Sequence, residues 1–561
     1  MLQNSSAQDQ NKNAMADRLP PLGPNLKALM IWPRFPASFW TFAKIMEILP
    51  KKANQPPLGL LTVAALCPST WELRLIDCTF EDLNESDLLW ADLVMVSGMH
   101  VQKADIHAIL RRARALGRRT IIGGPYASSV PEEVTPLADH VVVGEPDDVF
   151  GEIAADLEDG TARPLYVIDR KPDITHTPAP RFDLLRMDNY ISMAVQFSRG
   201  CPYQCEFCDI ITIYGRKPRT KTPAQMLAEL EALHELGWRD QVFVVDDNFI
   251  GNHKRALELA LSLGEWQRAH DCPFFFFTEA SIDLAQRPEL IDAMVRANFF
   301  YVFVGIESPA KESLVEAKKL QNLRRDPLDC IRFIQSRGLW VTAGFIVGFD
   351  SDPESIFELQ RDFIEQAAIP WAMAGLLQAP PTTPLYERMR KEGRLIESSR
   401  ATTNFSPPNF RTRLPLSLLL KGYRDTLADL YSPSGYYRRS LNSLLHWQSR
   451  KEQRVKLQYS FAAMAATLLR SILYQGILSS YRWEYWKFVY QILTRWSRNR
   501  SQLRMGLVVL FSGHHFINFA KRVVAELDAE IEKLAAAAAP ASVECCRERP
   551  VTGRLVAITE H

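Results

Sequence analysis

The chain carries the stretch Ser198-Arg199-Gly200-Cys201-Pro202-Tyr203-Gln204-Cys205-Glu206-Phe207-Cys208. Its three cysteines follow the spacing C-x3-C-x2-C, directly after an apolar run that is typical of a β-strand. Three thiolates can bind three irons of a four-iron cluster and leave the fourth iron open to a further ligand, whereas a cluster with four cysteines mostly carries electrons. The motif therefore predicts an iron–sulfur cluster at which chemistry takes place.

Other uses of three close cysteines fit the sequence less well. A structural zinc site needs a fourth ligand and usually shows paired C-x2-C halves, and this sequence has no second C-x2-C. Three neighbouring cysteines cannot all pair as disulfides. Four of the remaining cysteines stand in apolar surroundings, which indicates small buried side chains: Cys67, Cys78, Cys272 and Cys330.

The composition excludes several classes of protein. The 561 residues are 47% hydrophobic and 23% charged, as in ordinary globular proteins, and the net charge of +1 does not favour nucleic-acid binding. The polar N-terminus lacks the apolar segment of a signal peptide, and no apolar run of about 18 residues predicts a transmembrane helix. Because the cluster would be sensitive to oxygen, we expect a cytoplasmic protein. The net charge near zero leads us to expect no binding to nucleic acid.

Positive charge is concentrated toward the C-terminus. Residues 433–506 contain 13 Lys and Arg against two Glu, which gives +11 for this segment and leaves −10 for the rest of the chain. Trp, Tyr and Leu are interleaved with these basic residues. The pattern is typical of a helix at a membrane surface, and equally of a helical bundle whose long side chains cross apolar surface to reach water. Peripheral association with the inner face of the membrane therefore stays open.

Short apolar runs alternate with helical patterns from residue 26 to residue 165. We expect strands at 28–32, 73–76, 93–97, 120–122 and 140–143, and helices at 58–65, 103–116 and 147–157. This alternation predicts a doubly wound α/β domain with a parallel sheet, which binds ligands beyond the carboxyl ends of its strands. Small residues follow several of these ends, in Ser97-Gly98-Met99-His100, Gly123-Gly124-Pro125 and Gly144-Glu145-Pro146.

A second series of strands and helices occupies residues 191–394, after a linker at 166–190. We expect strands at 192–197, 241–245, 274–278, 299–304, 340–346 and 371–377. Six such units predict a partial (β/α)6 barrel, whose functional residues gather at the C-terminal ends of the strands. The basic run 216–221 has two interpretations, a solvated turn or a contact with a bound carboxylate.

The rest of the chain predicts a helical domain and two flexible ends. The helical domain covers residues 395–534, with helices expected at 415–431, 441–450, 455–476, 481–498 and 502–534. We expect residues 1–25 to be disordered and residues 535–561 to form a flexible tail.

The cysteine motif and the barrel pattern resemble those of the radical S-adenosylmethionine (SAM) enzymes. The resemblance implies that Cys201, Cys205 and Cys208 hold a 4Fe-4S cluster, whose open iron binds SAM and whose electron cleaves SAM to a radical. It also implies SAM contacts from the aromatic residue of the motif and from the strand ends, namely Phe207, Asp246, Asp247, Glu279, Glu307, Gly344 and Gly348.

The first domain resembles the cobalamin-binding domains that precede many radical SAM barrels. This resemblance implies cobalamin contacts from Pro57, Gly59, Ser97, Gly98, Gly123, Gly124, Gly144 and Glu145. One segment departs from the mutase-type pattern D-x-H-x-x-G, because the chain reads Trp32-Pro33-Arg34-Phe35-Pro36 after the first strand. A cobalt-binding histidine is therefore not expected there, and for His100 a packing role stands beside a role below the cobalt.

The order of the three domains is similar to that of the class B cobalamin-dependent radical SAM methyltransferases, most of all the hopanoid 2-methylating family. That resemblance implies methyl transfer from SAM, via methylcobalamin, to an unactivated carbon of an apolar or hopanoid-type lipid substrate, at C-2. It also implies an electron donor such as flavodoxin or ferredoxin. Two alternatives stay open: an oxidative or cyclising enzyme that uses the same cofactors without methyl transfer, and a non-catalytic corrinoid-binding sensor.

Overall fold

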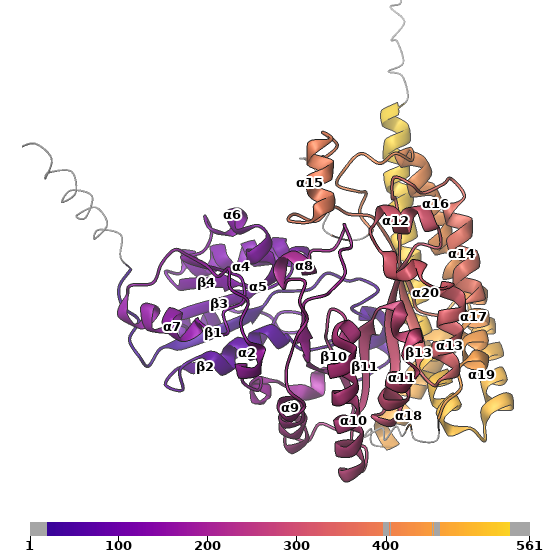
Figure 1. The fold of residues 1–561 in the computed structure, drawn as a ribbon, viewed down its shortest axis with the longest axis horizontal. Helices are drawn as coiled ribbons and strands as arrows, with labels where there is room; N and C mark the ends of the chain where they lie inside the picture. The colour runs from indigo at the N-terminus through magenta and orange to yellow at the C-terminus, as the bar shows by residue number, and fades with distance from the viewer. Residues whose placement is uncertain (1–18, 397–402, 404, 451–452, 454–460, 539–561) are drawn as a thin grey trace, which may run out of the picture.

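The computed structural model describes residues 19–396, 403, 405–450, 453 and 461–538. They form an α/β domain at the left of Figure 1, a second α/β unit in the centre and a layer of helices at the right. The predicted disorder of residues 1–18 and the predicted tail at 539–561 lie outside the described residues. Leu22 and Gly23 donate backbone hydrogen bonds to the carbonyls of Leu157 (3.2 Å) and Glu158 (3.0 Å). These two residues belong to the stretch 1–25 that was expected to be disordered, and the structure instead holds them against the first domain.

The first sheet has six parallel strands in the order β2-β1-β3-β4-β5-β6. Five of them lie where the apolar runs predicted them, because a strand covered on both faces needs apolar side chains on both. The sixth, β6, is the short apolar run Leu165-Tyr166-Val167, in which only the tyrosine is buried, and the prediction assigned its last two residues to the linker. The bounds are β1 Lys27–Trp32, β2 Glu72–Asp77, β3 Leu93–Ser97, β4 Arg119–Gly123, β5 His140–Val143 and β6 Leu165–Val167.

Helices cover both faces of this sheet, as the doubly wound prediction requires. Leu29 and Ile31 of β1 pack into a core with α3 and α4, whereas Ala28 and Met30 pack into a second core with α2 and α7. The helices are α2 Leu58–Leu66, α3 Glu85–Trp90, α4 Lys103–Ala115, α5 Gly124–Ser129, α6 Pro131–Val134 and α7 Phe150–Asp159.

The second sheet also has six parallel strands, in the order β14-β13-β12-β11-β10-β7. Strands β7 and β14 are its two edges, so the predicted partial barrel is confirmed. Its strands are β7 Met193–Val195, β10 Gln241–Val244, β11 Phe275–Ala280, β12 Phe299–Glu307, β13 Trp340–Val347 and β14 Ala372–Leu376, and Ser198–Arg199 (β8) pairs separately with Arg219–Thr220 (β9). The helices are α8 Ile210–Ile213, α9 Pro223–Glu235, α10 His253–Ala269, α11 Pro288–Arg296, α12 Lys311–Glu316, α13 Pro327–Ser336, α14 Ile356–Gln366 and α15 Pro384–Lys391.

The helical layer covers the free edge of the barrel. The hydroxyl groups of Tyr423 and Tyr431 donate hydrogen bonds to the β14 carbonyls of Ala374 (2.8 Å) and Ala372 (2.5 Å). Backbone acceptors at a sheet edge are thereby satisfied by side chains from α16 and the residue that follows it. The layer consists of α16 Leu416–Leu430, α17 Pro433–His446, α18 Phe461–Ser471, the π-helical turn η9 Ile472–Ile477, α19 Arg482–Trp496 and α20 Arg500–Ala538.

Several helix boundaries in this layer differ from the prediction, and α17 for example ends at His446 rather than at residue 450. Helix α17 begins at Pro433 rather than near residue 441, because the Ser432 hydroxyl caps it by accepting a hydrogen bond from the Gly435 N–H (3.2 Å) and proline suits the first turn. Helix α20 continues to Ala538, so residues 535–538 of the predicted tail are helical. None of the described helices is both long and apolar enough to pass through a lipid bilayer.

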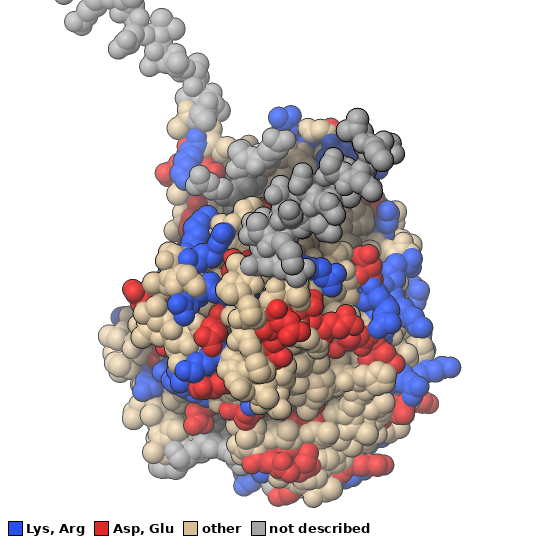
Figure 2. Space-filling view, turned by 90° about the vertical axis from the view of Figure 1, so that its left-hand side faces the viewer, with Lys and Arg blue, Asp and Glu red and all other residues tan. Residues whose placement is uncertain are grey.

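Acidic side chains gather near the middle of the face that the first domain presents in Figure 2. This distribution agrees with the charge of −10 that the chain carries outside residues 433–506. The two ends of the molecule in Figure 1 therefore differ in charge, since the basic segment belongs to the helical layer.

Candidate active site

A cavity of about 1710 Å³ lies between the first domain and the barrel, and both contribute to its wall. It is large enough for more than one small molecule, since pockets for single drug-sized ligands measure about 300–1,000 Å³. The predicted residues that line it are Pro57, Gly59, Ser97, Gly123, Gly124, Gly144, Glu145, Asp247 and Glu279. The structure therefore brings the two predicted sets of strand ends to one cavity.

The three-cysteine loop leaves the barrel after β8 and is fixed by a glycine. Gly200 has φ +92°, and a Cβ at this position would lie 2.7 Å from the carbonyl oxygen of Gly215. The Cys201 N–H donates a hydrogen bond to that same oxygen at 3.2 Å. A residue with a side chain at position 200 would be strained and would push the loop away from this anchor.

The thiol groups of the three cysteines are largely buried, and amide groups lie near two of them. Burial raises the pKa of all three thiols, so iron must displace the protons as it binds. Amide N–H groups approach two of the sulfurs, with Asn248 Nδ2 at 3.9 Å from Cys201 Sγ and Gln321 Nε2 at 3.9 Å from Cys205 Sγ. Within the described part of the chain, no three Cys, His, Asp or Glu converge on one metal ion, and a cluster instead needs each thiolate on a separate iron.

The two aspartates at the end of β10 have different surroundings. Asp246 is buried and accepts hydrogen bonds from the Phe197 N–H (2.7 Å) and the Ser198 hydroxyl (2.6 Å). Asp247 accepts from the Gly200 N–H (3.0 Å) and lines the cavity. Burial raises the pKa of Asp246 to about 7 and that of Asp247 to about 6. Asp246 therefore fixes the strand that leads into the cysteine loop, whereas only Asp247 borders the cavity.

Glu279 and Glu307 also differ. Glu279 lines the cavity and makes no hydrogen bond or ion pair with another residue that the structure describes. Burial, and next the negative charge of Asp247, raise the pKa of Glu279 to about 8. It is thus free to hydrogen-bond a ligand. Glu307 lies away from the cavity wall and forms a buried ion pair with Lys319. Gly305 makes room for this pair, because a Cβ there would lie 2.6 Å from each of the two charged groups.

The remaining predicted SAM contacts lie behind the cavity wall. A Cβ at Gly344 would lie 2.8 Å from the ring of Phe303, so this glycine makes room for that ring. Gly348 has φ +111° and donates its N–H to Asp352 at 2.8 Å. Phe207 packs edge-on against Phe349, with ring centroids 6.1 Å apart.

Glycines shape the first domain's side of the cavity. Gly124 has φ +86°, and a Cβ there would lie 2.3 Å from the Ser97 hydroxyl oxygen. Gly144 has φ +97°, and a Cβ there would lie 2.4 Å from the carbonyl of Ile168. Gly59 faces open space, with nothing within 4 Å of its Cβ position, whereas Gly98 is covered by Gln102 and Ile106. Gly124 and Gly144 therefore make room for neighbouring protein atoms, and among these four glycines only Gly59 leaves open space for a ligand.

Glu145 joins the two domains. Its carboxylate accepts hydrogen bonds from Arg199 (2.9 Å), which precedes the cysteine motif, and from Arg219 (2.8 Å). Arg199 also donates to Asp147 at 2.8 Å. Arg219 belongs to the basic run 216–221, so this arginine takes neither of the two predicted roles. Lys221 of the same run forms a buried ion pair with Glu229.

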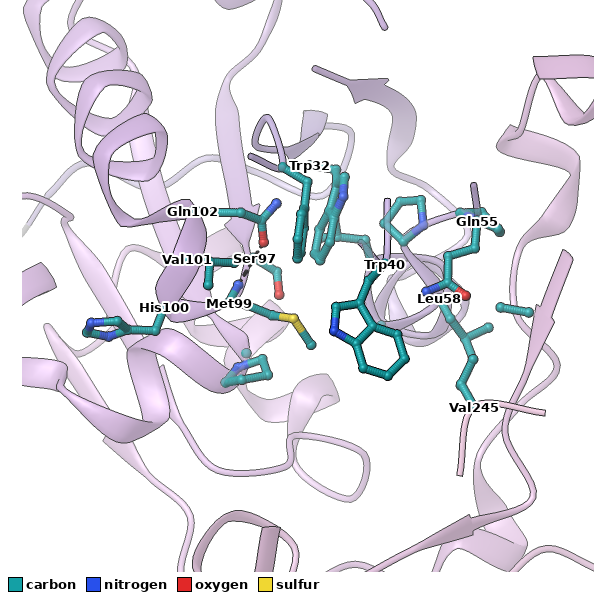
Figure 3. A pocket seen from close by; sticks show the side chains of 18 of the residues that line it. Trp32, Trp40, Gln55, Leu58, Ser97, Met99, His100, Val101, Gln102 and Val245 are labelled. Atoms are coloured by element: carbon teal, nitrogen blue, oxygen red, sulfur yellow. Dashed lines mark hydrogen bonds between the residues drawn. The ribbon is translucent and has the colours of Figure 1, made fainter. Parts of the chain in front are cut away.

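Figure 3 shows the middle of the cavity. The Trp40 indole projects between Met99 of the first domain and Val245 of the barrel, and the His100 ring is turned away from it. His100 packs edge-on against Tyr126 at 5.4 Å, and its buried Nδ1 has no hydrogen-bond partner among the described residues. Of the two roles considered for His100, the contact with Tyr126 supports packing.

Three families match consecutive parts of the chain. Residues 52–154 match the B12 binding domain, residues 195–363 match the radical SAM superfamily, and residues 383–529 match a domain of unknown function, DUF4070. The fold, the cysteine loop and these matches define a radical SAM enzyme with a B12-binding domain before the barrel.

Named relatives take the assignment further. The chain is 40% identical over 511 residues to an uncharacterized methyltransferase of Synechocystis sp., covering 90% of this chain and 94% of that protein. It is 35% identical over 504 residues to the hopanoid C-2 methylase of Rhodopseudomonas palustris, covering 88% and 94%. The chain belongs to the cobalamin-dependent radical SAM methyltransferases.

Two solved structures share the fold. The radical SAM methyltransferase TsrM from Kitasatospora setae, solved with cobalamin and a 4Fe-4S cluster, gives a TM-score of 0.57 at 14% identity and covers 80% of this chain and 99% of its own. The cobalamin-dependent radical SAM enzyme OxsB gives 0.56 at 14% identity, covering 91% and 81%. These two structures support the fold. The family matches and the named relatives make the protein a methyltransferase whose cofactors are a 4Fe-4S cluster, SAM and cobalamin.

Proposed function

We propose that the protein methylates an unactivated ring carbon of a polycyclic apolar lipid of the hopanoid type, at C-2. The observation that carries this proposal is the aromatic wall at the barrel end of the cavity. A relative that is 35% identical along most of both chains and is named hopanoid C-2 methylase supports the same substrate class.

The aromatic wall consists of stacked rings on neighbouring strands. Phe243 stacks on Phe277, with centroids 4.2 Å apart and planes inclined by 5°, and Phe277 stacks on Tyr301 at 4.4 Å and 17°. Phe303, on the same strand as Tyr301, packs edge-on against Trp40 at 4.6 Å. All five rings line the cavity. Such a wall can bury a rigid, flat hydrocarbon and offers few polar partners to a hydrophilic substrate.

The residues predicted from the sequence receive the following roles in this proposal. Cys201, Cys205 and Cys208 hold the cluster, and Asp247 and Glu279 meet the polar groups of SAM. The other predicted SAM residues, Phe207, Asp246, Glu307, Gly344 and Gly348, shape the walls behind that site. Cobalamin lies along Pro57, Gly59, Ser97, Gly123, Gly124, Gly144 and Glu145, with Gly98 behind Ser97.

The cofactors supply a radical that removes a hydrogen atom from the substrate carbon and a methyl group that takes its place. The protein's part is to hold that carbon between the two domains and to exclude water, which the aromatic wall does. No general base is assigned, because a carbon without an acidic proton gives a base nothing to remove.

We also propose that a reductant such as flavodoxin or ferredoxin supplies the electrons, and that the protein works at the inner face of the membrane. The second point follows from the substrate, because a pentacyclic hydrocarbon resides in a lipid bilayer.

Methyl transfer to a defined substrate tests the proposal. The anaerobically reconstituted protein receives cobalamin, a reductant, SAM with a CD3 group, and either a pentacyclic hopene or its acyclic counterpart squalene in detergent. We expect hopene to gain a CD3 group in place of hydrogen and squalene to remain unchanged, with Cys205→Ala as the inactive control.

Other products would overturn the proposal in recognisable ways. An oxidised or cyclised product without CD3 would support a relative that does not transfer methyl groups. Retention of cobalamin without turnover of SAM would support a corrinoid-binding sensor. Methylation of squalene as readily as hopene would overturn the polycyclic substrate.

A further inference from the structure

Exposed apolar side chains are concentrated on one pair of helices in the C-terminal layer. Eleven of the 26 exposed large hydrophobic side chains of the described chain lie between residues 464 and 493. They are Met464, Leu468 and Leu469 on α18, Leu473, Tyr474, Ile477 and Leu478 in and after η9, and Trp483, Trp486, Tyr490 and Leu493 on α19. We call this surface the α18–α19 face; α19 lies on the outer side of the helical layer in Figure 1.

The exposure of these side chains is extreme for a protein surface in water. Trp483 is 74% exposed, Tyr490 69% and Leu469 66%. Large contiguous apolar patches on a folded protein mark a surface that contacts a partner or a membrane. The α18–α19 face therefore needs an occupant.

The charges beside the face indicate which occupant. Residues 461–500 contain six basic residues, all of them exposed, namely Arg470, Arg482, Lys487, Arg495, Arg498 and Arg500. The one acidic residue of this segment, Glu484, lies 3.8 Å from Lys487. A second copy of the chain would bring the same positive charge against this one, which opposes self-association. Anionic lipid head groups complement it, at about 1 kcal/mol per Lys or Arg near the membrane surface.

The face continues toward the wall of the cavity. The hydroxyl of Tyr481, between η9 and α19, lies 3.3 Å from His514 Nδ1 on α20. His514 Nε2 in turn lies 2.8 Å from the carboxylate of Glu47, in the short helix η1 (Ala43–Glu47). Ala43 and Met46 of η1 and the preceding Trp40 line the cavity. One chain of contacts thus connects the exposed face with the cavity wall.

We propose that the α18–α19 face lies on a bilayer that contains anionic lipids and holds the cavity wall at residues 40–47 close to it. Trp and Tyr at the level of the head groups, with Arg and Lys around them, are typical of helices that lie in a membrane interface. The inference rests on the proposed function only in that a lipid substrate has to be drawn from a membrane. Binding to the bilayer itself requires no substrate.

Sedimentation with vesicles tests the face. The reconstituted full-length protein is mixed with vesicles of phosphatidylcholine alone or with added phosphatidylglycerol. We expect it to sediment with the anionic vesicles and to be released by salt. The combined variant Leu469→Ser, Trp483→Ser and Tyr490→Ser should bind these vesicles with an affinity reduced by at least about tenfold. The control Leu89→Ser, Leu261→Ser and Leu359→Ser removes three exposed apolar side chains elsewhere, which are 42–51% exposed, and should bind like the wild type.

Three results would overturn the inference. They are no sedimentation of the wild type, equal binding to both kinds of vesicle, or equal losses in the two combined variants. A wild-type dimer that the α18–α19 variant dissociates would show that a second copy covers the face. Circular dichroism of both variants excludes unfolding as the cause of a loss. Vesicle binding without methylation of hopene in detergent would overturn the proposed substrate and leave the docking face standing.

Discussion

The carboxylate of Glu145 and the guanidinium of Arg199 lie 2.9 Å apart, although they belong to different domains and are 54 residues apart in the chain. Both side chains are almost fully buried. Arg199 stands two residues before Cys201, so the same segment that carries the cluster motif also fastens the first domain to the barrel. The geometry between the two domains therefore depends on the base of the cysteine loop.

Arg199→Ala should be strongly destabilising. It removes the arginine that pairs with the buried Asp147 carboxylate, whereas Glu145 keeps its hydrogen bond from Arg219. A buried charge left without its partner costs about 3–5 kcal/mol. The matched control is Arg170→Ala, which breaks an exposed pair with Asp148 and should cost less than about 1 kcal/mol. Urea unfolding of the two variants measures the loss in the free energy of unfolding. Equal losses would show that the interdomain pair stabilises the protein no more than the exposed pair does.

Gly59→Ala should separate stability from cobalamin binding. Position 59 is helical and open, so alanine should stabilise the cofactor-free protein by about 0.5–1 kcal/mol. If the corrin ring lies against this glycine, the same methyl group weakens cobalamin binding. Equilibrium dialysis with hydroxocobalamin measures the affinity, and an unchanged affinity would place cobalamin elsewhere along the wall.

Gly124→Ala is the companion change. The positive φ and the short distance to Ser97 should reduce stability by about 1–2 kcal/mol even without cobalamin. Thermal unfolding of the cofactor-free protein checks this value. A variant as stable as the wild type would mean that the turn after β4 can relax.

Cys205→Ala should abolish the cluster. Two thiolates cannot replace three, so the variant should lose the iron and the visible absorption of the reconstituted protein. Cys330→Ala is the control, because this cysteine is also buried but lies in α13, outside the loop. Iron and sulfide analysis after desalting distinguishes them. A full cluster in Cys205→Ala would contradict the assignment.

The stability of the contact between α20 and residues 39–44 should depend on pH. His515 is buried, its Nδ1 accepts from the Lys44 N–H (3.3 Å), and its Nε2 lies 3.2 Å from the Phe39 carbonyl oxygen. Burial lowers the pKa of His515 to about 4, so the unfolded chain binds the proton more readily than the folded one. Stability is therefore complete above the unfolded pKa of about 6.5 and falls as the pH decreases toward 4.

Comparison with His515→Gln isolates this residue from other titrating groups. Between about pH 7.5 and about pH 5, the wild type should lose about 2 kcal/mol more than the variant. Chemical denaturation at the two pH values measures the difference. Parallel losses in the two proteins would mean that His515 is protonated without cost in the folded state.

The sequence predicted most of this fold because its strands are covered on both faces. A run such as Phe299–Val304 has to be apolar throughout, and turns mark where it ends. The cysteine loop was equally readable, since all its ligands are neighbours in the chain. Strand β6 was not predicted, because its three apolar residues are too few to show a strand pattern.

The contacts between distant segments could not be read from the sequence. Nothing in the pattern around Arg219 distinguishes a partner for Glu145 from a solvated turn, because the two are joined only by the packing of two domains. Asp246 and Asp247 look equivalent in the chain, yet one holds a strand and the other borders the cavity. The roles of these residues depend on contacts with other elements of the fold, which the sequence does not show.

The hydrogen bonds from the hydroxyl groups of Tyr423 and Tyr431 to the β14 carbonyls determine whether the domains can be separated. A chain shortened after α15 would keep every strand of the barrel but leave a row of backbone acceptors open to pairing with other chains. The helical layer is therefore part of the barrel wall and cannot be exchanged as an independent module. Chimaeras between relatives should keep β14, Tyr423 and Tyr431 from one parent.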